Sequence, residues 1–239
     1  MISGKVAVVT GGSRGIGRAI ARALVEAGAR VAITAMSDDT LRQTAGELSS
    51  VARDAAVLPI RADVRRQADV EMAMELAVGH FGGIDILVNN AGVGVFRAVA
   101  EMSVEDWHRI VETNVTGVFY CCKAVLPHLR ARGGGWIINI SSLSGKHPFP
   151  DAAAYCASKA ALNAFSEALM QEVRHDDIRV ACVMPGSVRT GFSGRSAGND
   201  DWKLAPEDVA RVVTDLLSYP SRSLPSAVEI RPARPPKKS

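Results

Sequence analysis

The chain has 239 residues, of which 47% are hydrophobic and 22% are charged, so it can bury a substantial core and falls within the size range of one α/β domain. Its net charge of +3 gives little reason to propose a nucleic acid or a membrane surface as a partner. No apolar run reaches the roughly 18 residues of a membrane span, and the N-terminus lacks a cleavable signal pattern. We therefore expect a soluble, cytoplasmic protein.

Short apolar segments alternate with helix-like segments along the chain. The first, KVAVVT at residues 5–10, is too short for a helix and breaks on two glycines before the amphipathic segment at residues 15–28. Such alternation implies parallel strands joined by right-handed helical crossovers, hence a three-layer, doubly wound α/β sandwich. The predicted strands of its mostly parallel, seven-stranded sheet are residues 5–10, 30–34, 56–60, 84–88, 136–140, 178–183 and 227–230.

No repeat and no long linker interrupts this alternation, so we expect residues 1–231 to form a single domain. Residues 232–239 are rich in proline and lysine and are expected to form a flexible tail. The four cysteines lack a C-x-x-C spacing, which is typical of reduced, mostly buried thiols in a cytosol. The five histidines are scattered and unpaired with cysteine, so we predict no metal site.

A glycine-rich turn, TGGSRGIG at residues 10–17, follows the first predicted strand and precedes the first predicted helix. Glycines at positions 11, 15 and 17 would allow a sharp turn, close approach of the backbone to a pyrophosphate, and tight packing of helix on strand. Backbone N–H groups at the helix start would then face the phosphates. Because the spacing G-x-x-x-G-x-G departs from the usual G-x-G-x-x-G, a turn without a ligand is the alternative, but the position between strand and helix favours a dinucleotide site.

Tyr155 and Lys159 are four residues apart in a segment of good helix formers, so their side chains are expected to share one helical face. An ammonium near a tyrosine favours the phenolate and brings its pKa toward the range useful for general acid/base catalysis. Ser142 follows a predicted strand, and its hydroxyl could bind a substrate oxygen that gains charge. A helix-face tyrosine beside a solvated lysine is the alternative.

Three further motifs accompany the ones described above. In chain order, the complete set is the glycine-rich turn, NNAG at residues 89–92, Asn114, Ser142, the Tyr155 and Lys159 pair, and Pro-Gly at residues 185–186. Together they resemble the short-chain dehydrogenase/reductase family, and within it the 3-oxoacyl-reductase-like members. The resemblance covers roughly residues 4–190, and such joint agreement is far more specific than any one motif. It implies a nicotinamide-dependent oxidoreductase with a single Rossmann-like domain, assembled as a homotetramer.

The resemblance also implies four catalytic residues. Tyr155 would be the general acid/base, Lys159 would lower its pKa and hold the nicotinamide ribose, and Ser142 would bind the substrate oxygen. Asn114 would hold a water in a proton relay behind Lys159. The alternative is that Asn114 is an ordinary polar residue in the middle of a helix.

Further residues are placed against the cofactor by the same resemblance. Asp63 and Val64 would lie at the adenine, residues 89–92 would form a wall, and residues 185–188 with Thr190 would hold the carboxamide. A helix N-cap at Asp63 and turn formation at residues 89–90 are the alternatives. The expected cofactor-binding residues are Gly11, Ser13, Arg14, Gly15, Ile16, Gly17, Ser37, Asp63, Val64, Asn89, Ala91, Gly92, Tyr155, Lys159, Pro185, Gly186, Val188 and Thr190.

The end of the second predicted strand indicates which nicotinamide cofactor is used. NAD-preferring chains carry an acidic residue there, which bonds the ribose 2′-hydroxyl and repels a phosphate. The corresponding position is Ala35 or Met36, so this carboxylate is absent. The resemblance places Arg14 beside a 2′-phosphate, and Ser37 could add a hydrogen bond. We expect the two aspartates that follow to begin a helix, so NADP(H) is the predicted cofactor and NAD(H) the alternative.

Two features depart from the family pattern. The chain closes with SAVEIRPARPPKKS instead of the glycine-rich segment that builds the tetramer interface in many members. The segment between Thr190 and Pro206, where a lid over the substrate is expected, is short and predicts a compact or polar-accessible pocket. We still expect a homodimer or homotetramer, in which the helices that begin near Ser103 and Ala154 form the interface. The alternative is that both helices simply pack in the core of a single chain. Their broad apolar faces comprise Val111, Val115, Val118, Phe119, Ala160, Ala161, Ala164 and Phe165.

We therefore predict an oxidoreductase that moves hydride between NADP(H) and a carbonyl or secondary-alcohol substrate, with Tyr155 as general acid/base. One alternative is an epimerase or dehydratase with the same trio, although this length leaves no room for an added substrate domain. The other is a cofactor-binding regulator or scaffold, which would not need an acid/base pair. Candidate substrate-lining positions are largely apolar and suggest a hydrophobic ketone, aldehyde or 3-oxoacyl group: residues 93–96, Leu143, Ser144, residues 147–149, Gly186 and Phe192.

Overall fold

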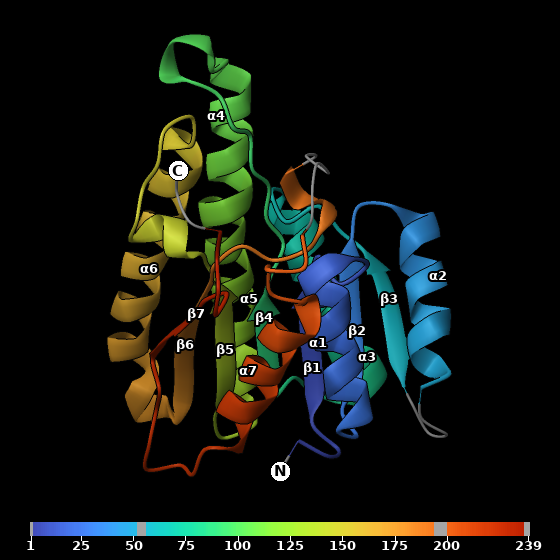
Figure 1. The fold of residues 1–239 in the computed structure, drawn as a ribbon. Coiled ribbons are helices and arrows are strands. Elements are labelled where there is room, and N and C mark those ends of the chain that lie inside the picture. Colours follow the sequence, from blue (N-terminus) through green and yellow to red (C-terminus); the bar gives the residue numbers. More distant parts are fainter. Residues whose placement is uncertain (1, 52–55, 194–199, 237–239) are drawn as a thin grey trace.

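The computed structural model describes residues 2–51, 56–193 and 200–236. Within these residues, seven strands form one sheet in the order β3-β2-β1-β4-β5-β6-β7, and every pairing is parallel (Figure 1). The predicted α/β fold is confirmed, with a sheet that is entirely rather than mostly parallel. The strands are β1 Val6–Thr10, β2 Arg30–Ala35, β3 Val57–Arg61, β4 Ile86–Asn89, β5 Gly135–Ile140, β6 Ile178–Pro185 and β7 Ala227–Ile230.

Helices cover both faces of the sheet and complete the three layers. One hydrophobic core joins the sheet to α1, α2 and α7, and the other joins it to α3, α5 and α6. The shorter α4 extends beyond the sheet, above the carboxyl ends of the central strands (Figure 1). The helices are α1 Gly15–Glu26, α2 Asp38–Ser49, α3 Gln67–Phe81, α4 Val104–Val111, α5 Gly117–Ala131, α6 Ala153–Val173 and α7 Pro206–Ser218.

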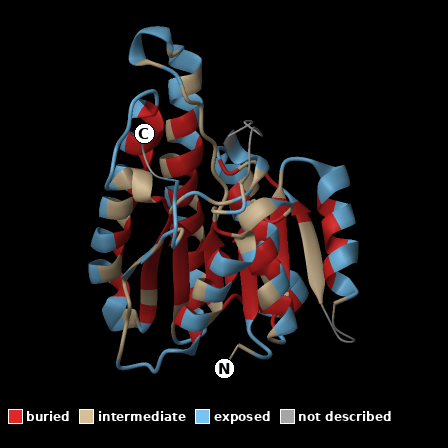
Figure 2. Ribbon diagram, in the orientation of Figure 1, coloured by how far each residue is buried: buried red, intermediate tan, exposed pale blue. Residues whose placement is uncertain are grey.

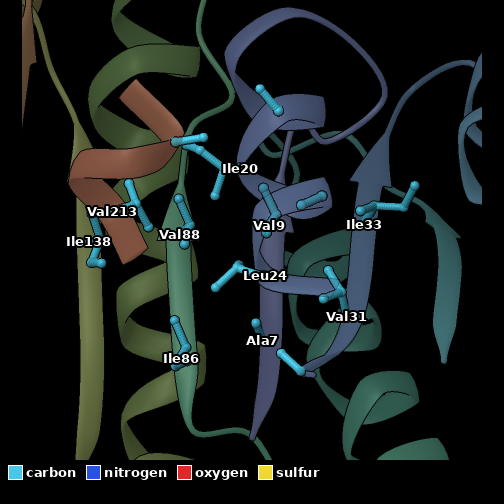
Figure 3. Close-up of a cluster of buried hydrophobic side chains, with 14 of the residues drawn as sticks. Ala7, Val9, Ile20, Leu24, Val31, Ile33, Ile86, Val88, Ile138 and Val213 are labelled. Carbon is cyan, nitrogen blue, oxygen red and sulfur yellow. The ribbon is translucent and has the colours of Figure 1, made fainter. Parts of the chain in front are cut away.

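The central strands read as continuous apolar runs because both faces of the sheet are covered. In β1, Ala7 and Val9 face the core shared with α1, whereas Val6 and Val8 face the opposite core. Figure 3 shows the first of these cores, and Figure 2 shows that the buried residues concentrate in the strands between the helix layers. Each fully buried side chain of this size contributes roughly 1.5–3 kcal/mol, so these strands dominate the stability of the fold.

A buried carboxylate joins the starts of β1 and β4 to the end of α5. Asp85, just before β4, accepts hydrogen bonds from the Val6 backbone at 2.9 Å, from Lys5 at 3.0 Å and from Arg132 at 3.2 Å. Burial opposes ionisation of this side chain, but these bonds outweigh it and hold the pKa of Asp85 below its usual value. The strand predicted from residue 84 begins at Ile86 in the structure, directly after Asp85.

The strand order creates a crevice at one edge of the sheet. The chain continues from β1 to β2 on one side, while β4 lies on the other side of β1. The helices that follow β1 and β4 therefore diverge, and ligands bind in the crevice outside the carboxyl ends of such strands. The glycine-rich turn lies at this switch point.

The structure also bears on the cysteines, on membrane-spanning helices and on the predicted C-terminal tail. All four cysteines are free and buried, as predicted. In the described part of the chain, none of the helices combines the length and apolar character needed to cross a membrane. Residues 232–236 contain neither helix nor strand, and the last three residues of the predicted tail lie outside the described residues.

Candidate active site

The glycine-rich turn is fixed to the end of β4. The Thr10 hydroxyl accepts hydrogen bonds from the Asn90 and Ala91 backbones, each at 3.0 Å. The Asn90 side chain donates to the Thr10 carbonyl at 3.0 Å and to the Gly11 carbonyl at 3.1 Å. The sequence did not predict that Thr10 and Asn90 fix the turn to β4. The signal that could have indicated it is a polar residue at the end of each of these two neighbouring strands.

Two glycines of the turn occupy positions that no other residue fits. Gly11 has a φ of 63°, and a Cβ there would lie 2.9 Å from the Ala91 Cα. A Cβ at Gly17 would collide with the Gly11 carbonyl and the Asn90 amide. The turn therefore keeps its backbone exposed to the crevice, with the first N–H groups of α1 directed out of the helix end, as a phosphate site requires.

The remaining residues of the turn lie at the start of α1. Arg14 is the N-cap residue of α1, and its exposed side chain makes no capping hydrogen bond. Thr44 of α2 donates to the Ser13 carbonyl at 2.9 Å, which holds the turn against α2, while Ile16 packs against the core. A Cβ at Gly15 would lie 3.4 Å from the Thr190 methyl group, so Thr190 and the turn face each other across the crevice.

The two aspartates after β2 begin α2, as expected. Asp38 and Asp39 form its exposed first turn, after Ser37 as N-cap residue. Asp63 pairs with Arg65 at 2.6 Å, and this hydrogen-bonded pairing holds the pKa of Asp63 below its usual value. The N-cap residue of α3 is Arg66, so Asp63 does not cap the helix.

The side chain of Asn89 points away from the crevice. Its amide donates to Asn139 at 2.9 Å and to the Cys122 sulfur at 3.3 Å, and the residue is 2% exposed. Asn139 donates in turn to Ser166 of α6 at 2.9 Å. Of the expected wall, Asn90 and Ala91 adjoin the turn and Gly92 lies beside Asn114 and Lys159. The Asn89 side chain instead forms part of a polar network inside the core.

Asn114 lies in a π-helical turn, Glu112–Thr116, that joins α4 to α5. Its amide oxygen accepts from the Val93 backbone at 2.9 Å, and its amide nitrogen donates to the Val93 carbonyl at 2.9 Å and to Ser158 at 3.0 Å. A Cβ at Gly92 would lie 3.3 Å from the Asn114 oxygen and 3.8 Å from the Lys159 nitrogen. Such single π-turns are frequent at functional sites, and this one brings Asn114 beside Lys159.

Tyr155 and Lys159 lie in the first two turns of α6, with the Lys159 Nζ 5.8 Å from the centre of the Tyr155 ring. Lys159 donates to the Ile140 carbonyl at 2.9 Å, and both side chains are at most 9% exposed. The alternative of a solvated lysine is therefore wrong. Ser142, at the end of β5, bonds Ser144 and also Tyr155, so the three predicted residues come together.

The pKa values of this pair differ from the expectation that Lys159 lowers the pKa of Tyr155. Burial raises the pKa of Tyr155 to about 12, although its hydrogen bond with Ser142 acts in the opposite direction. Burial also lowers the pKa of Lys159 to about 8. Loss of solvent is the largest cause of both shifts, and the Lys159 ammonium is directed to the Ile140 carbonyl.

Three phenylalanines lie near Tyr155, two of them in direct ring contact with it. The rings of Phe96 and Phe192 lie 5.6 Å and 5.7 Å from the Tyr155 ring, and Phe149 stacks on Phe96 at 6.2 Å. A Cβ at Gly94 would lie 2.8 Å from the Phe192 ring. These rings belong to the substrate-lining positions expected from the sequence, and they form an apolar wall beside Tyr155.

The segment after β6 closes the crevice on its far side. Gly186 donates from its backbone to the Ile230 carbonyl at 2.8 Å, and a Cβ there would meet Pro232 and Leu143. Val188 forms a parallel bridge with Leu204. The predicted lid includes residues 194–199, which lie outside the described residues.

Comparisons with known proteins agree with this geometry. The family model for short chain dehydrogenases matches residues 5–200. An uncharacterized oxidoreductase of Staphylococcus epidermidis is 33% identical over 228 residues, covering 95% of this chain and 97% of its own. The structure of an alcohol dehydrogenase from Thermococcus sibiricus, complexed with 5-hydroxy-NADP, is similar with a TM-score of 0.90 and 33% identity, covering 98% and 99% of the two chains.

A third similar structure is a 3-ketoacyl-(acyl-carrier-protein) reductase from Brucella melitensis complexed with NADH, with a TM-score of 0.89 and 30% identity over 98% of this chain and 99% of the other. The family match covers most of the chain, and the relatives match it over nearly their whole length. The expected resemblance is thereby confirmed. The chain belongs to the short-chain dehydrogenase family and is an oxidoreductase of that family.

Proposed function

We propose that the chain transfers hydride between NADP(H) and a carbonyl or secondary-alcohol substrate, with Tyr155 as general acid/base. The observation that carries the proposal is the convergence of Ser142, Tyr155, Lys159 and Asn114 beside a glycine turn that opens onto the same crevice. A regulator or scaffold without turnover would not need a buried tyrosine, serine and lysine at this place. An epimerase or dehydratase would use the same trio.

The residues around the crevice fit a dinucleotide. The turn at residues 11–17 would hold the pyrophosphate, Asp63 and Val64 the adenine end, and Thr190 with residues 185–188 the carboxamide. Lys159 and Tyr155 would contact the nicotinamide ribose. When bound, the cofactor supplies or accepts the hydride.

The protein's part in carbonyl reduction is to orient the substrate and to supply a proton. The Tyr155 hydroxyl would donate its proton to the carbonyl oxygen, while the Ser142 hydroxyl stabilises the charge that develops on that oxygen. In alcohol oxidation, the deprotonated Tyr155 would accept the proton instead. The Ile140 carbonyl holds the Lys159 ammonium, and Asn114 holds Ser158, the residue before Lys159.

The apolar wall of Phe96, Phe149 and Phe192 supports a hydrophobic substrate. Aromatic rings bury a large apolar area and prefer offset or edge-on contacts with other flat groups. A ketone or aldehyde with an apolar body would therefore be accepted better than a polyhydroxylated one.

Arg14→Ala tests both the reaction and the cofactor preference. Wild-type protein should consume NADPH when offered a panel of apolar carbonyl compounds. One hydrogen bond to a charged group contributes about 1.5–3 kcal/mol, so the variant should lose roughly 10- to 100-fold in kcat/KM with NADPH and little with NADH. Arg14 is exposed at the start of α1, and the absence of an acidic side chain at Ala35 and Met36 supports a 2′-phosphate there.

The measurement is the loss of reduced-cofactor absorbance, with Arg18→Ala as matched control because Arg18 is an exposed arginine of the same helix that pairs with Glu47. Equal losses with both cofactors in Arg14→Ala would contradict the assigned role. Failure of the wild type to turn over any carbonyl or alcohol would instead favour the regulator or the epimerase.

We also propose that the chain forms a homodimer or homotetramer in the cytoplasm. The four free, buried thiols support a reducing compartment. On the expected faces, Phe119, Ala160, Ala161 and Ala164 are exposed, whereas Val118 belongs to the core. Light scattering should therefore give two or four times 25.3 kDa, and the mass of a single chain at micromolar concentration would contradict the assembly.

A further inference from the structure

A large cleft lies at the opposite edge of the sheet from the candidate active site, where β1, β4, β5 and β6 begin. The strand starts that line it lie toward the N-terminal end of the molecule, at the bottom of Figure 1. Its volume is about 830 Å³. This volume falls within the range of roughly 300–1,000 Å³ that is typical of small-molecule sites. Tyr155 lies in the first turn of α6 and Arg174 follows the end of this helix, so the two sites are about 28 Å apart along the helix axis.

The cleft is strongly basic. Five basic side chains and two carboxylates line it, an excess of three positive charges, whereas the net charge of the entire chain is +3. Lys5 and Arg132 both pair with the buried Asp85, so part of this charge is already balanced. The lining charges are Lys5, Asp85, Arg132, Arg174, Asp177, Arg179 and Arg222.

Three arginines from separate segments supply most of the remaining positive charge, which Asp177 offsets in part. Arg179 of β6 donates to the Tyr219 carbonyl at 3.1 Å, and its guanidinium lies 4.2 Å from the centre of the Trp136 ring. The side chains of Arg174 and Arg222 form no ion pair or hydrogen bond with any residue that the structure describes. Partial burial lowers the pKa of Arg179, so an anion in the cleft would stabilise its charge.

The apolar part of the lining, which we call the floor, is more buried than most of the basic side chains, which we call the rim. Ile2, Met170, Leu217 and Leu224 line the cleft together with the first residues of β4 and β6. A basic rim over an apolar floor fits a molecule that has both an anionic group and an apolar body. Guanidinium groups bind phosphate oxygens through paired hydrogen bonds, and a phosphate offers the charge and the number of acceptors that several arginines can share.

We propose that this basic cleft binds a small organic anion that carries two or more phosphate groups, at a site separate from the nicotinamide cofactor. Arg174, Arg179 and Arg222 bind the phosphates, and the apolar floor accommodates the rest of the molecule. The site lies outside the catalytic machinery, so the proposal does not depend on the proposed reaction.

Inorganic tripolyphosphate is the probe, and its binding to the full chain is measured by isothermal titration calorimetry without substrate or cofactor. The wild type should bind it with a single site, and the double variant Arg174→Gln/Arg222→Gln should bind at least about 10-fold more weakly, because two charge-assisted contacts are lost. A double variant with the same change in charge, Arg22→Gln/Arg211→Gln, is the control. Both of its arginines are exposed and lie outside the cleft lining.

Thermal melting curves would verify that both variants are folded. Binding that falls equally in both double variants would reveal a general charge effect and overturn the proposal. Unchanged binding in Arg174→Gln/Arg222→Gln would place the probe elsewhere, for example at the glycine turn, and would also overturn it. The proposal would likewise be overturned if the wild type did not bind tripolyphosphate at millimolar concentration.

Discussion

Replacing Tyr155 by phenylalanine is expected to lower kcat by about 10²-fold or more, which is the low end of general acid/base contributions, while cofactor affinity stays nearly unchanged. The substitution removes the hydroxyl that would exchange the proton with the substrate. The ring itself remains between Phe96 and Phe192, so the shape of the site is preserved. Steady-state consumption of NADPH measures kcat, and a fluorescence titration measures cofactor binding.

Tyr120→Phe is the matched control, because Tyr120 is a partly buried tyrosine of α5 whose ring contacts Phe119. It loses the same hydroxyl from a tyrosine of another helix, outside the candidate active site. Near-normal turnover in Tyr155→Phe would mean that another group moves the proton, and the assignment of Tyr155 would be wrong.

Lys159→Ala should impair both catalysis and cofactor binding. The ammonium lies between Asn114, Gly92 and the Ile140 carbonyl. Its removal eliminates both the proposed contact with the ribose and the positive charge near Tyr155. We expect kcat to fall by about 10²-fold or more together with a measurable loss of cofactor affinity. Lost turnover with intact cofactor affinity would contradict the double role.

The pH profile separates this role from a merely structural one. Because burial lowers the pKa of Lys159 to about 8, the ammonium is present below that pH and is lost as pH rises through it. The Tyr155 hydroxyl, with a pKa raised to about 12, stays protonated over the same range. In the wild type, kcat/KM for carbonyl reduction should be level below about pH 8 and decline above it, since this parameter reports the free enzyme.

Lys159→Ala should lack this decline, whereas Lys123→Ala should retain it. Lys123 is an exposed lysine of α5 whose ammonium lies 5.9 Å from the Phe119 ring, remote from the trio. A profile in Lys159→Ala that still declines through the same pH would assign the titration to a different group.

Much of the fold was predictable because the chain repeats a local pattern. Strands buried on both faces are continuous apolar runs, and β7 has the predicted bounds at residues 227–230. The glycine turn and the spacing of Tyr155 and Lys159 are local features, so their positions also followed from the sequence. The extent of the single domain at residues 1–231 and the assembly stay predictions.

What the sequence did not predict depends on contacts between distant residues. Adjacent Asn89 and Asn90 look alike in sequence, yet alternation along β4 directs one into the core and the other to the glycine turn. The pKa directions of Tyr155 and Lys159 were missed because burial depends on packing by other elements. Likewise, the basic cleft gathers arginines from β6, from beyond α6 and from the loop before β7, which no local pattern would associate.

The all-parallel sheet also constrains the order in which a growing chain can fold. Parallel neighbours cannot be joined by a tight hairpin, so each pairing must wait for a crossover to be synthesised. β1 lies between β2 and β4, and its Ala7 pairs with Ile86, far along the chain. At about 5–20 residues per second, translation takes roughly 4–16 seconds to cover that interval. During this time the first strand has an open edge toward the missing β4, where a chaperone or another nascent chain has access before the protein itself closes the gap.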